Sequence, residues 1–305
     1  MIIRGGDRFV DAAVWMASAS RIPPFVIGAT VVSLATTLPE MLVSVMASLS
    51  GQADMATGNA IGSVTANTAL ILAVSIVFMP GPIDRSRYLP KVLLLMAAVA
   101  LLWVTGLSGS VNVFGCIGMF ILFGVYLYEN LHSARIERRG EETEQINTDR
   151  KTVVKNILVF IVGAAEIILG SRLLVDNGTL IARDVLHIDE RIISLTMVAV
   201  GTSLPELVTA ISAVIKRNAS LTAGNILGAN ILDTLLILPV CAVANGGSLP
   251  LSNSTLWIDI PFCMLVIALT MIPALIKKRF TRAAGLAALA AYAVYCAGLF
   301  TSGWK

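Results

Sequence analysis

Residues 201–206 read GTSLPE and residues 35–40 read ATTLPE, so the chain contains nearly the same hexapeptide twice. The two copies lie 166 residues apart, and the same offset relates later stretches of the two halves. These matched stretches are Gly58-Asn59 with Gly224-Asn225, Gly62 with Gly228, Asn67-Thr68 with Asp233-Thr234, and 70–72 with 236–238. A register held over this distance indicates an internal duplication. Each copy places a glutamate after a proline in an apolar run, which is costly in lipid and points to a functional role.

The composition predicts an integral membrane protein whose main partner is the lipid bilayer. Of the 305 residues, 56% are hydrophobic and 13% are charged, and the mean hydropathy is +0.84. A soluble domain carries roughly twice that charged fraction. The net charge of +3 does not indicate nucleic acid binding, because the basic residues lie in short connections between apolar runs. No Gly-x4-Gly-Lys-Ser/Thr phosphate loop is present, and we expect neither a cofactor nor an obligatory protein partner.

Apolar runs predict an all-α membrane protein with about ten transmembrane helices, five in each of two repeats. The predicted helices cover about 2–19, 24–49, 55–79, 88–106, 110–130, 153–185, 190–215, 221–243, 256–276 and 281–300. Residues 1–130 form the first repeat, 131–152 a charged linker, and 153–305 the second repeat. The first helix is short and charged, whereas its counterpart at 153–185 is long. We therefore expect that a half-helix is missing from the N-terminus.

Five helices per repeat place the two repeats in opposite orientations. Alternate connections carry Lys or Arg, at Arg21, Arg85–Lys91, Arg135–Lys155, Lys216–Arg217 and Lys277–Arg282. The positive-inside rule then places the central linker in the cytoplasm and both termini outside, in the plasma membrane. Inverted repeats that each contain a broken polar helix are typical of secondary transporters.

The two prolines predict broken helices beside the matched glutamates. Pro39 and Pro205 lack an N–H, so the carbonyl four residues earlier loses its helical donor. The opened turn also loosens the carbonyls of Thr36 and Thr202. Irregular backbone at membrane depth is tolerated only where it lines a cavity or is buried in protein. Each repeat therefore offers backbone oxygens close to a carboxylate.

The donor atoms around these turns favour a hard cation such as calcium or sodium. They are carboxylate, carbonyl, hydroxyl and amide oxygens, without a nearby histidine or cysteine. The side chains are those of Glu40, Glu206, Thr36, Thr37, Thr202, Ser203, Asn67 and Asp233. A proline kink alone is common in membrane helices, and the glycine pairs are more often packing features. Two buried glutamates at matched positions favour a binding site over packing.

Two further acidic positions are interpreted as structural. Glu166 lies in a long apolar run without a partner in the other repeat, and we expect it at a pore edge or paired with Arg172. Asp11 and Asp176 match each other and sit near predicted helix ends, where an interfacial or capping role is expected.

The duplicated motifs, ATTLPE…GNAIGSVTAN and GTSLPE…GNILGANILD, resemble the sodium/calcium exchangers of the cation/calcium antiporter superfamily, especially their prokaryotic members. The resemblance covers nearly the whole chain. It implies ten helices, a four-site cation cluster at the membrane midplane, and alternating access by sliding of two long tilted helices. The transported ions would be calcium and sodium.

The resemblance also implies roles for particular residues. Glu40 and Glu206 match the central calcium ligands, with the carbonyls of Thr36 and Thr202 beside them and Asn67 and Asp233 flanking. The positions that match sodium-site ligands are Ser33, Thr37, Ser63, Ala199 and Ser203. This chain departs from the family pattern at Ala35, at Thr37 and at Ala229, which replaces the serine paired with Ser63.

Several functions are compatible with this pattern. The leading hypothesis is a secondary antiporter that exchanges calcium for sodium. Calcium/proton exchange is an alternative because of the lost hydroxyl at Ala229, and potassium-dependent exchange is another because of Asp233. A cation channel or a membrane metalloenzyme is the alternative outside this class. Inverted repeats disfavour a channel, and an enzyme would lack a histidine base, since His132 and His187 both fall in connections.

Overall fold

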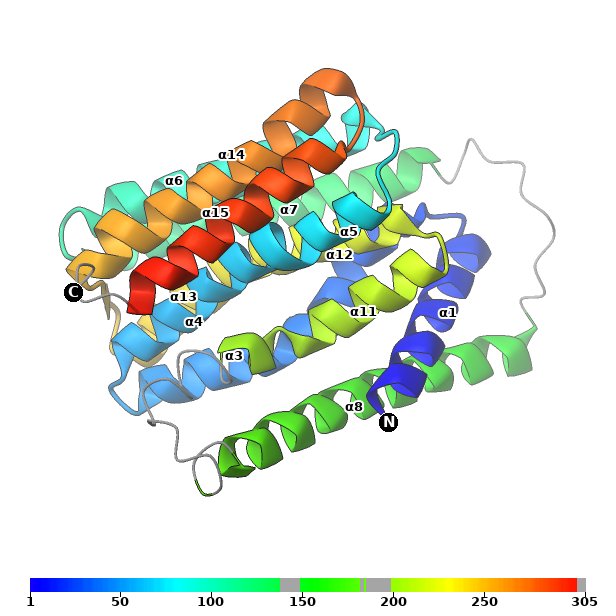
Figure 1. The fold of residues 1–305 in the computed structure, drawn as a ribbon, viewed down its shortest axis with the longest axis horizontal. Coiled ribbons are helices and arrows are strands. Elements are labelled where there is room, and N and C mark those ends of the chain that lie inside the picture. The colour runs from blue at the N-terminus through cyan, green and yellow to red at the C-terminus, as the bar shows by residue number, and fades with distance from the viewer. Residues whose placement is uncertain (138–148, 182–183, 185–198, 301–305) are drawn as a thin grey trace.

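A computed structural model describes residues 1–137, 149–181, 184 and 199–300. The described part of the chain is a bundle of long helices (Figure 1). In the first half, the elements are α1 (Ile2–Ser20), α2 (Pro24–Ile27), η1 (Gly28–Val32), α3 (Ser33–Leu49), α4 (Ala53–Ala66), η2 (Asn67–Leu72), α5 (Ala73–Phe78), α6 (Arg85–Gly106), β1 (Ser110–Val111) and α7 (Val113–Glu137). The segments η1 and η2 are π-helical and join their neighbours into two continuous rods, 24–49 and 53–78.

The second half repeats this arrangement. Its described elements are α8 (Arg150–Leu180), α10 (Ala199–Thr202), α11 (Leu204–Ile215), α12 (Ala219–Leu232), η5 (Asp233–Ile237), α13 (Leu238–Ala244), β2 (Leu249–Pro250), η6 (Thr255–Asp259), α14 (Ile260–Lys277) and α15 (Arg282–Phe300). Again α12, η5 and α13 form one rod, and so do η6 and α14. Helices α7 and α8 both extend into the segment that the sequence predicts as the linker.

The helices confirm a multi-pass membrane protein. Within the described residues, seven helical rods are long and apolar enough to cross a membrane. Helix α11 and most of α15 are shorter apolar helices, and α1 carries four charged side chains. These ten segments correspond to the ten predicted ones, and their ends agree with the prediction to within a few residues wherever both ends are described, apart from the longer C-terminal end of α7. The start of the predicted helix 190–215 lies outside the described residues.

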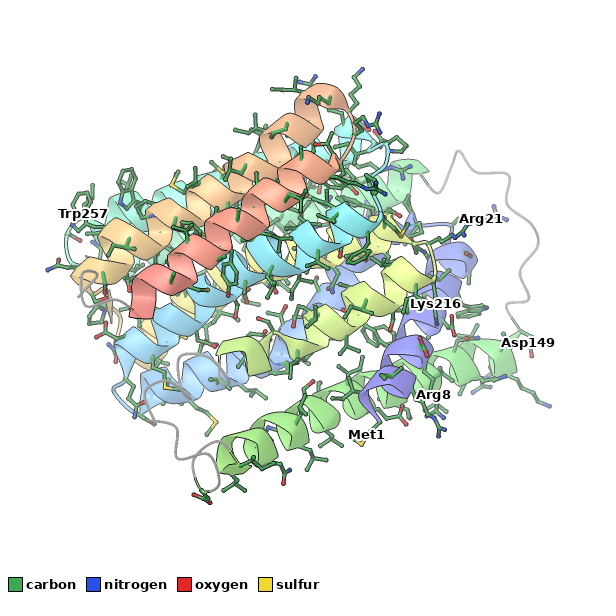
Figure 2. All side chains as sticks on the ribbon, viewed as in Figure 1. Met1, Arg8, Arg21, Asp149, Lys216 and Trp257 are labelled. Atoms are coloured by element: carbon green, nitrogen blue, oxygen red, sulfur yellow. The ribbon has the colours of Figure 1, made fainter. Side chains whose placement is uncertain are left out.

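The two ends of the bundle differ in charge. Figure 2 shows Arg21, Asp149 and Lys216 toward one end of the bundle and Trp257 at the other. At the basic end, Pro82 forms a β-bridge with Arg279, which links the connection after α5 to the connection after α14. At the opposite end, β1 pairs with β2 in antiparallel register. Each pairing joins a connection of the first half to one of the second, so the two halves are fastened together at both ends.

The rod that begins with α12 occupies the centre of the bundle. In the apolar stretch of this rod that could span a membrane, 83% of the residues are buried, compared with 28% in the corresponding stretch of α8. Close packing against the first repeat depends on glycine: a Cβ on Gly224 would lie 2.1 Å from the carbonyl oxygen of Phe25, and one on Gly228 would lie 2.7 Å from that of Ala29. Gly224 and Gly228 are therefore packing features, in line with the interpretation of the sequence. Around Gly58 and Gly62 no described atom lies within 4 Å of such a Cβ.

Helices α1 and α8 form a tightly packed pair along one edge of the bundle (Figure 1). The seam is lined by small residues, since a Cβ on Gly5 would lie 2.7 Å from Cβ of Glu166, and one on Gly163 would lie 2.8 Å from the amide nitrogen of Phe9. The rings of Phe9 and Phe160 stack with centroids 4.3 Å apart. Small residues at membrane helix interfaces allow backbones to approach closely, which strengthens van der Waals packing.

Candidate cation-binding site

The two matched glutamates are buried on neighbouring helices. Glu40 on α3 is 1% exposed and Glu206 in the first turn of α11 is fully buried. Helix α3 contacts both α11 and η5, the segment that begins with Asp233. The structure therefore brings together three carboxylates that are far apart in the sequence. Their mutual repulsion in a low-dielectric interior makes this arrangement unfavourable unless positive charge is added.

The predicted site residues account for most of the buried side-chain atoms that lack a hydrogen-bond partner among the described residues. Both carboxylate oxygens are unpartnered in each of three acids, and both amide atoms in Asn67. The atoms belong to Glu40, Glu206, Asp233, Asn67, Thr37, Ser63 and Ser203. Each unsatisfied buried polar group costs about 1–3 kcal/mol, and an isolated charge costs more. A cluster of this kind suits a cation, because a cation is coordinated by several oxygen atoms at once.

No group of three acidic, imidazole or thiol side chains in the described residues is arranged to hold a metal ion alone. A cation here would depend on hydroxyl, amide and backbone oxygens in addition to the carboxylates. Mixed shells of this composition, with many oxygens and few charges, are typical of calcium and sodium.

The threonine hydroxyls at the matched turns form hydrogen bonds across the two repeats. Thr36 Oγ1 donates to Oδ1 of Asn225 at 3.3 Å, and Thr202 Oγ1 donates to Oδ1 of Asn59 at 3.3 Å. The offset of 166 residues relates both partners of one bond to those of the other. Of the predicted ligands, Thr36 and Thr202 thus use their hydroxyls for contacts between the two repeats. Ser33 Oγ donates to the carbonyl of Thr30 at 3.1 Å.

The two asparagines were not among the site residues predicted from the sequence, where they served only as markers of the duplication. Asn59 also donates to Ser44 Oγ at 2.9 Å, and Asn225 donates to Thr209 Oγ1 at 3.1 Å. Each amide therefore links its own repeat to the threonine beside the glutamate of the other repeat. The signal was present, since both asparagines are polar residues in apolar helices at matched positions.

The prolines act differently in the two repeats. In the second, the helix is interrupted at Ser203, between α10 and α11, as the sequence predicts. In the first, Pro39 lies inside the uninterrupted helix α3, so the predicted break there is wrong. The irregular backbone lies upstream instead, in the π-helical η1, where the Tyr126 hydroxyl from α7 donates to the Ala29 carbonyl.

A second pair of irregular segments begins at predicted site residues. The π-helices η2 and η5 begin at Asn67 and Asp233, which are matched positions. A π-helical turn contains one residue more than an α-helical turn and occurs often at functional sites. Ala199 is the first residue of α10, beside the cluster in sequence.

The helical architecture agrees with the results of comparison with known proteins. The model of one protein family, described as "Sodium/calcium exchanger protein", matches residues 1–131 and 155–301 of this chain. This chain belongs to the sodium/calcium exchanger family.

Relatives of this exchanger come from bacteria and archaea. The inner membrane protein YrbG of Escherichia coli K12 is 35% identical over 264 residues, which cover 83% of this chain and 80% of that protein. The sodium/calcium exchanger MaX1 of Methanosarcina acetivorans is 25% identical, with 78% of each chain covered. The putative antiporter CaxA of Alkalimonas amylolytica is 29% identical over 81% of this chain and 78% of its own length.

Solved structures of the sodium-calcium exchanger NCX_Mj share the fold of this exchanger. One, soaked with 2.5 mM Na⁺ and 10 mM Sr²⁺, superimposes with a TM-score of 0.84 and 29% identity, covering 97% of this chain and 94% of NCX_Mj. Another, soaked with 10 mM Na⁺ and no Ca²⁺, has the same TM-score at 30% identity. The ten-helix architecture implied by the resemblance is therefore supported over nearly the full length.

Two expectations about acidic residues outside the cluster are wrong in this exchanger. Glu166 pairs not with Arg172 but with Arg8 of α1, at 2.6 Å between Oε1 and Nη1. Asp11 lies in the middle of α1, not at its end, and its Oδ1 is 2.6 Å from Nζ of Lys216 after α11. Both ion pairs join α1 to a helix of the second repeat. Sequence spacing within one helix could not reveal such partners.

Proposed function

We propose that this exchanger is a secondary antiporter that moves calcium against sodium, with Glu40 and Glu206 as the central cation ligands. The observation that carries the proposal is the cluster of buried oxygens without partners, contributed by matched positions of the two repeats. The flanking ligands are Asn67 and Asp233. Neutral oxygens come from the backbone of Thr36 and Thr202 and from Ser33, Thr37, Ser63, Ser203 and the Ala199 backbone.

Competition for the same oxygens explains exchange. The carboxylates of Glu40 and Glu206 balance one divalent ion or two monovalent ions, so calcium and sodium cannot both fill the central position. Without a cation, the buried negative charges are strongly unfavourable in the bilayer interior. An empty carrier is therefore hindered from changing its orientation, and each crossing carries one ion species or the other.

The change in access uses the α1–α8 pair as the moving part. These helices pack mainly on each other through the glycine seam, while α12 and its neighbours hold the cation ligands. The pair contacts α11 through Gly6, where a Cβ would lie 2.7 Å from Ser212 Oγ, and through the Lys216–Asp11 ion pair. Sliding of the pair along α11 would open the cluster to one side of the membrane and then to the other.

The orientation in the membrane follows from the charged end of the bundle. Because the basic connections gather at one end, we place that end and the segment between α7 and α8 in the cytoplasm. We place the exchanger in the plasma membrane, with both termini on the outer side.

A second candidate function is calcium exchange that depends on potassium or on protons. Asp233 is buried with both carboxylate oxygens unpartnered, so it adds a third negative charge that one calcium ion does not neutralise. Ala229 is fully buried at the position that matches Ser63, so one sodium-site hydroxyl is absent. Both features favour an additional or different counter-ion.

The test is calcium uptake into vesicles that contain the purified exchanger. A sodium gradient, a pH gradient and a sodium gradient with potassium are imposed in separate experiments, and we expect the sodium gradient alone to drive uptake. Glu40→Gln and Glu206→Gln should each abolish it, because an amide binds hard cations more weakly than a carboxylate. Glu166→Gln makes the same change outside the cluster and should retain uptake. Near-normal uptake by either site variant would refute the ligand assignment.

A further inference from the structure

A groove unconnected with the cation cluster lies on the outer side of the α1–α8 pair. Its volume is about 740 Å³. It is lined by the first four turns of α8 and by one side chain of α1, namely Arg150, Lys151, Val154, Lys155, Leu158, Val159, Val162 and Arg8. These residues include four cationic side chains and no acidic one. A groove of this charge repels calcium and sodium, so it does not belong to the ion pathway.

Three of the four basic side chains gather toward the end of the bundle where the other basic connections lie. Arg150, Lys151 and Lys155 occupy the beginning of α8, at the end where Figure 2 shows Asp149, whereas Arg8 of α1 lies further along α8, paired with Glu166. Two carboxylates of the described residues are close by. Asp149 accepts a hydrogen bond from the amide of Thr152 at 3.3 Å, and Glu166 is paired with Arg8. Among the described residues, the three cations at the beginning of α8 therefore exceed the one neighbouring acid, which leaves net positive charge for an anionic ligand.

The apolar part of the groove runs along the helix axis. Val154, Leu158 and Val162 recur every four residues on one face of α8, and they are 48%, 55% and 46% exposed. The distance along the axis from Lys151 to Val162 is about 16 Å at 1.5 Å per residue. The hydrocarbon region of one leaflet is about 15 Å deep. A soluble anion would leave this stripe uncovered, whereas an acyl chain beneath a phosphate would cover it.

We propose that this groove binds one anionic glycerophospholipid, with its phosphate among the basic side chains at the beginning of α8 and an acyl chain along Val154, Leu158 and Val162. Basic pockets between transmembrane helices on the cytoplasmic side are suited to anionic headgroups. Because the groove is formed by both α1 and α8, the bound lipid contacts the two helices together. Its binding does not depend on which ions the exchanger carries.

The experiment is native mass spectrometry of the full chain in detergent, titrated with dioleoyl phosphatidylglycerol or dioleoyl phosphatidylcholine. We expect one phosphatidylglycerol to bind preferentially. The double variant Lys151→Gln/Lys155→Gln should bind it roughly 30-fold more weakly, because each basic residue contributes to the attraction. Lys277→Gln/Lys278→Gln removes the same charge from another exposed connection at the same end and should bind normally. Circular dichroism checks that both variants are folded.

Two further arms separate a lipid site from a simple anion site. Excess inorganic phosphate should not displace phosphatidylglycerol, and Leu158→Gln should weaken binding although it changes no charge. Equal binding of phosphatidylcholine, or unchanged binding by the Lys151→Gln/Lys155→Gln variant, would overturn the proposal. Full displacement by phosphate together with normal binding by Leu158→Gln would also overturn it, in favour of a small-anion site.

Discussion

Replacing Asn225 by leucine tests the contacts between the repeats at the cation cluster. Asn225 is buried on α12, accepts from Thr36 Oγ1 at 3.3 Å, and donates to Thr209 Oγ1 at 3.1 Å. Leucine has nearly the same size but removes both bonds. Each threonine hydroxyl keeps one other acceptor, the carbonyl of Ser33 for Thr36 and that of Glu206 for Thr209. The variant therefore leaves neither threonine without a partner and is expected to fold.

The effect should appear in calcium affinity. The bond from Thr36 holds in place the turn whose carbonyl we propose as a ligand, and one hydrogen bond contributes about 0.5–1.5 kcal/mol. If that contribution is lost only in the calcium-bound form, the calcium concentration for half-maximal uptake rises roughly 2- to 13-fold. The assay is sodium-driven calcium uptake in vesicles across a range of calcium concentrations. Asn59→Leu, the matched change in the other repeat, should give a similar increase.

The control is Asn156→Leu, because in the described part of the chain that amide donates only to the Thr152 carbonyl of its own helix, at 2.9 Å. Its calcium affinity should stay at the wild-type value. Unchanged affinity in both Asn225→Leu and Asn59→Leu, with normal protein levels, would refute the idea that these bonds position the ligands. A large loss of thermal stability without a change of affinity would assign the amides to folding alone.

Three other predictions concern the counter-ion, the orientation and one helix end. Ala229→Ser should lower the sodium concentration for half-maximal exchange severalfold, because a sodium-site oxygen is gained. Ser63→Ala should raise that concentration severalfold, because such an oxygen is lost. An unchanged sodium requirement in both variants would place these positions outside the cluster. With the native cysteines replaced, Asn253→Cys should react with an impermeant thiol reagent in intact cells and Lys278→Cys should not; the reverse labelling would invert the topology. Asp84→Ala should lower the free energy of unfolding by about 1 kcal/mol, since Asp84 caps α6. Hydrogen bonds from Ser86 lower the Asp84 pKa, so the stabilisation by Asp84 is present at neutral pH and is lost only as the pH falls through this lowered value. The assignment would be contradicted if the difference in melting temperature between wild type and Asp84→Ala disappeared well above the usual aspartate range.

Much of the fold could be predicted because the bilayer imposes a strong length and polarity rule on each helix. The apolar runs located nearly every described helix end within a few residues, and the fixed offset between the halves identified the inverted repeat. The same offset selected the oxygens that the structure buries together, since Glu40, Glu206, Asn67 and Asp233 all follow from it. An internal duplication thus supplied information that a single copy would not contain.

The remaining features depend on packing between helices, which the sequence pattern does not encode. The break expected at Pro39 is absent, and the irregular backbone of this rod lies in the π-helical turn of η1 instead. The ion pairs of Glu166 and Asp11 connect α1 to helices more than 150 residues away. Lys91, grouped with a connection by its charge, lies buried in α6 and is paired with Glu129 at 2.6 Å. Such partners become visible only when the helices are placed side by side.

The near-complete burial of the α12 rod has a consequence for biogenesis. This segment is apolar enough to enter lipid by itself, yet it carries Asn225, Asn230 and Asp233, whose polar groups are unfavourable in contact with acyl chains. The surface that accepts it, formed by α2, η1 and α3, is synthesised much earlier in the chain. The first repeat is therefore inserted in the membrane before the second repeat, and α12 then packs against it. A ribosome that stalls between the two repeats would leave the surface of α2, η1 and α3 that receives α12 uncovered in the membrane.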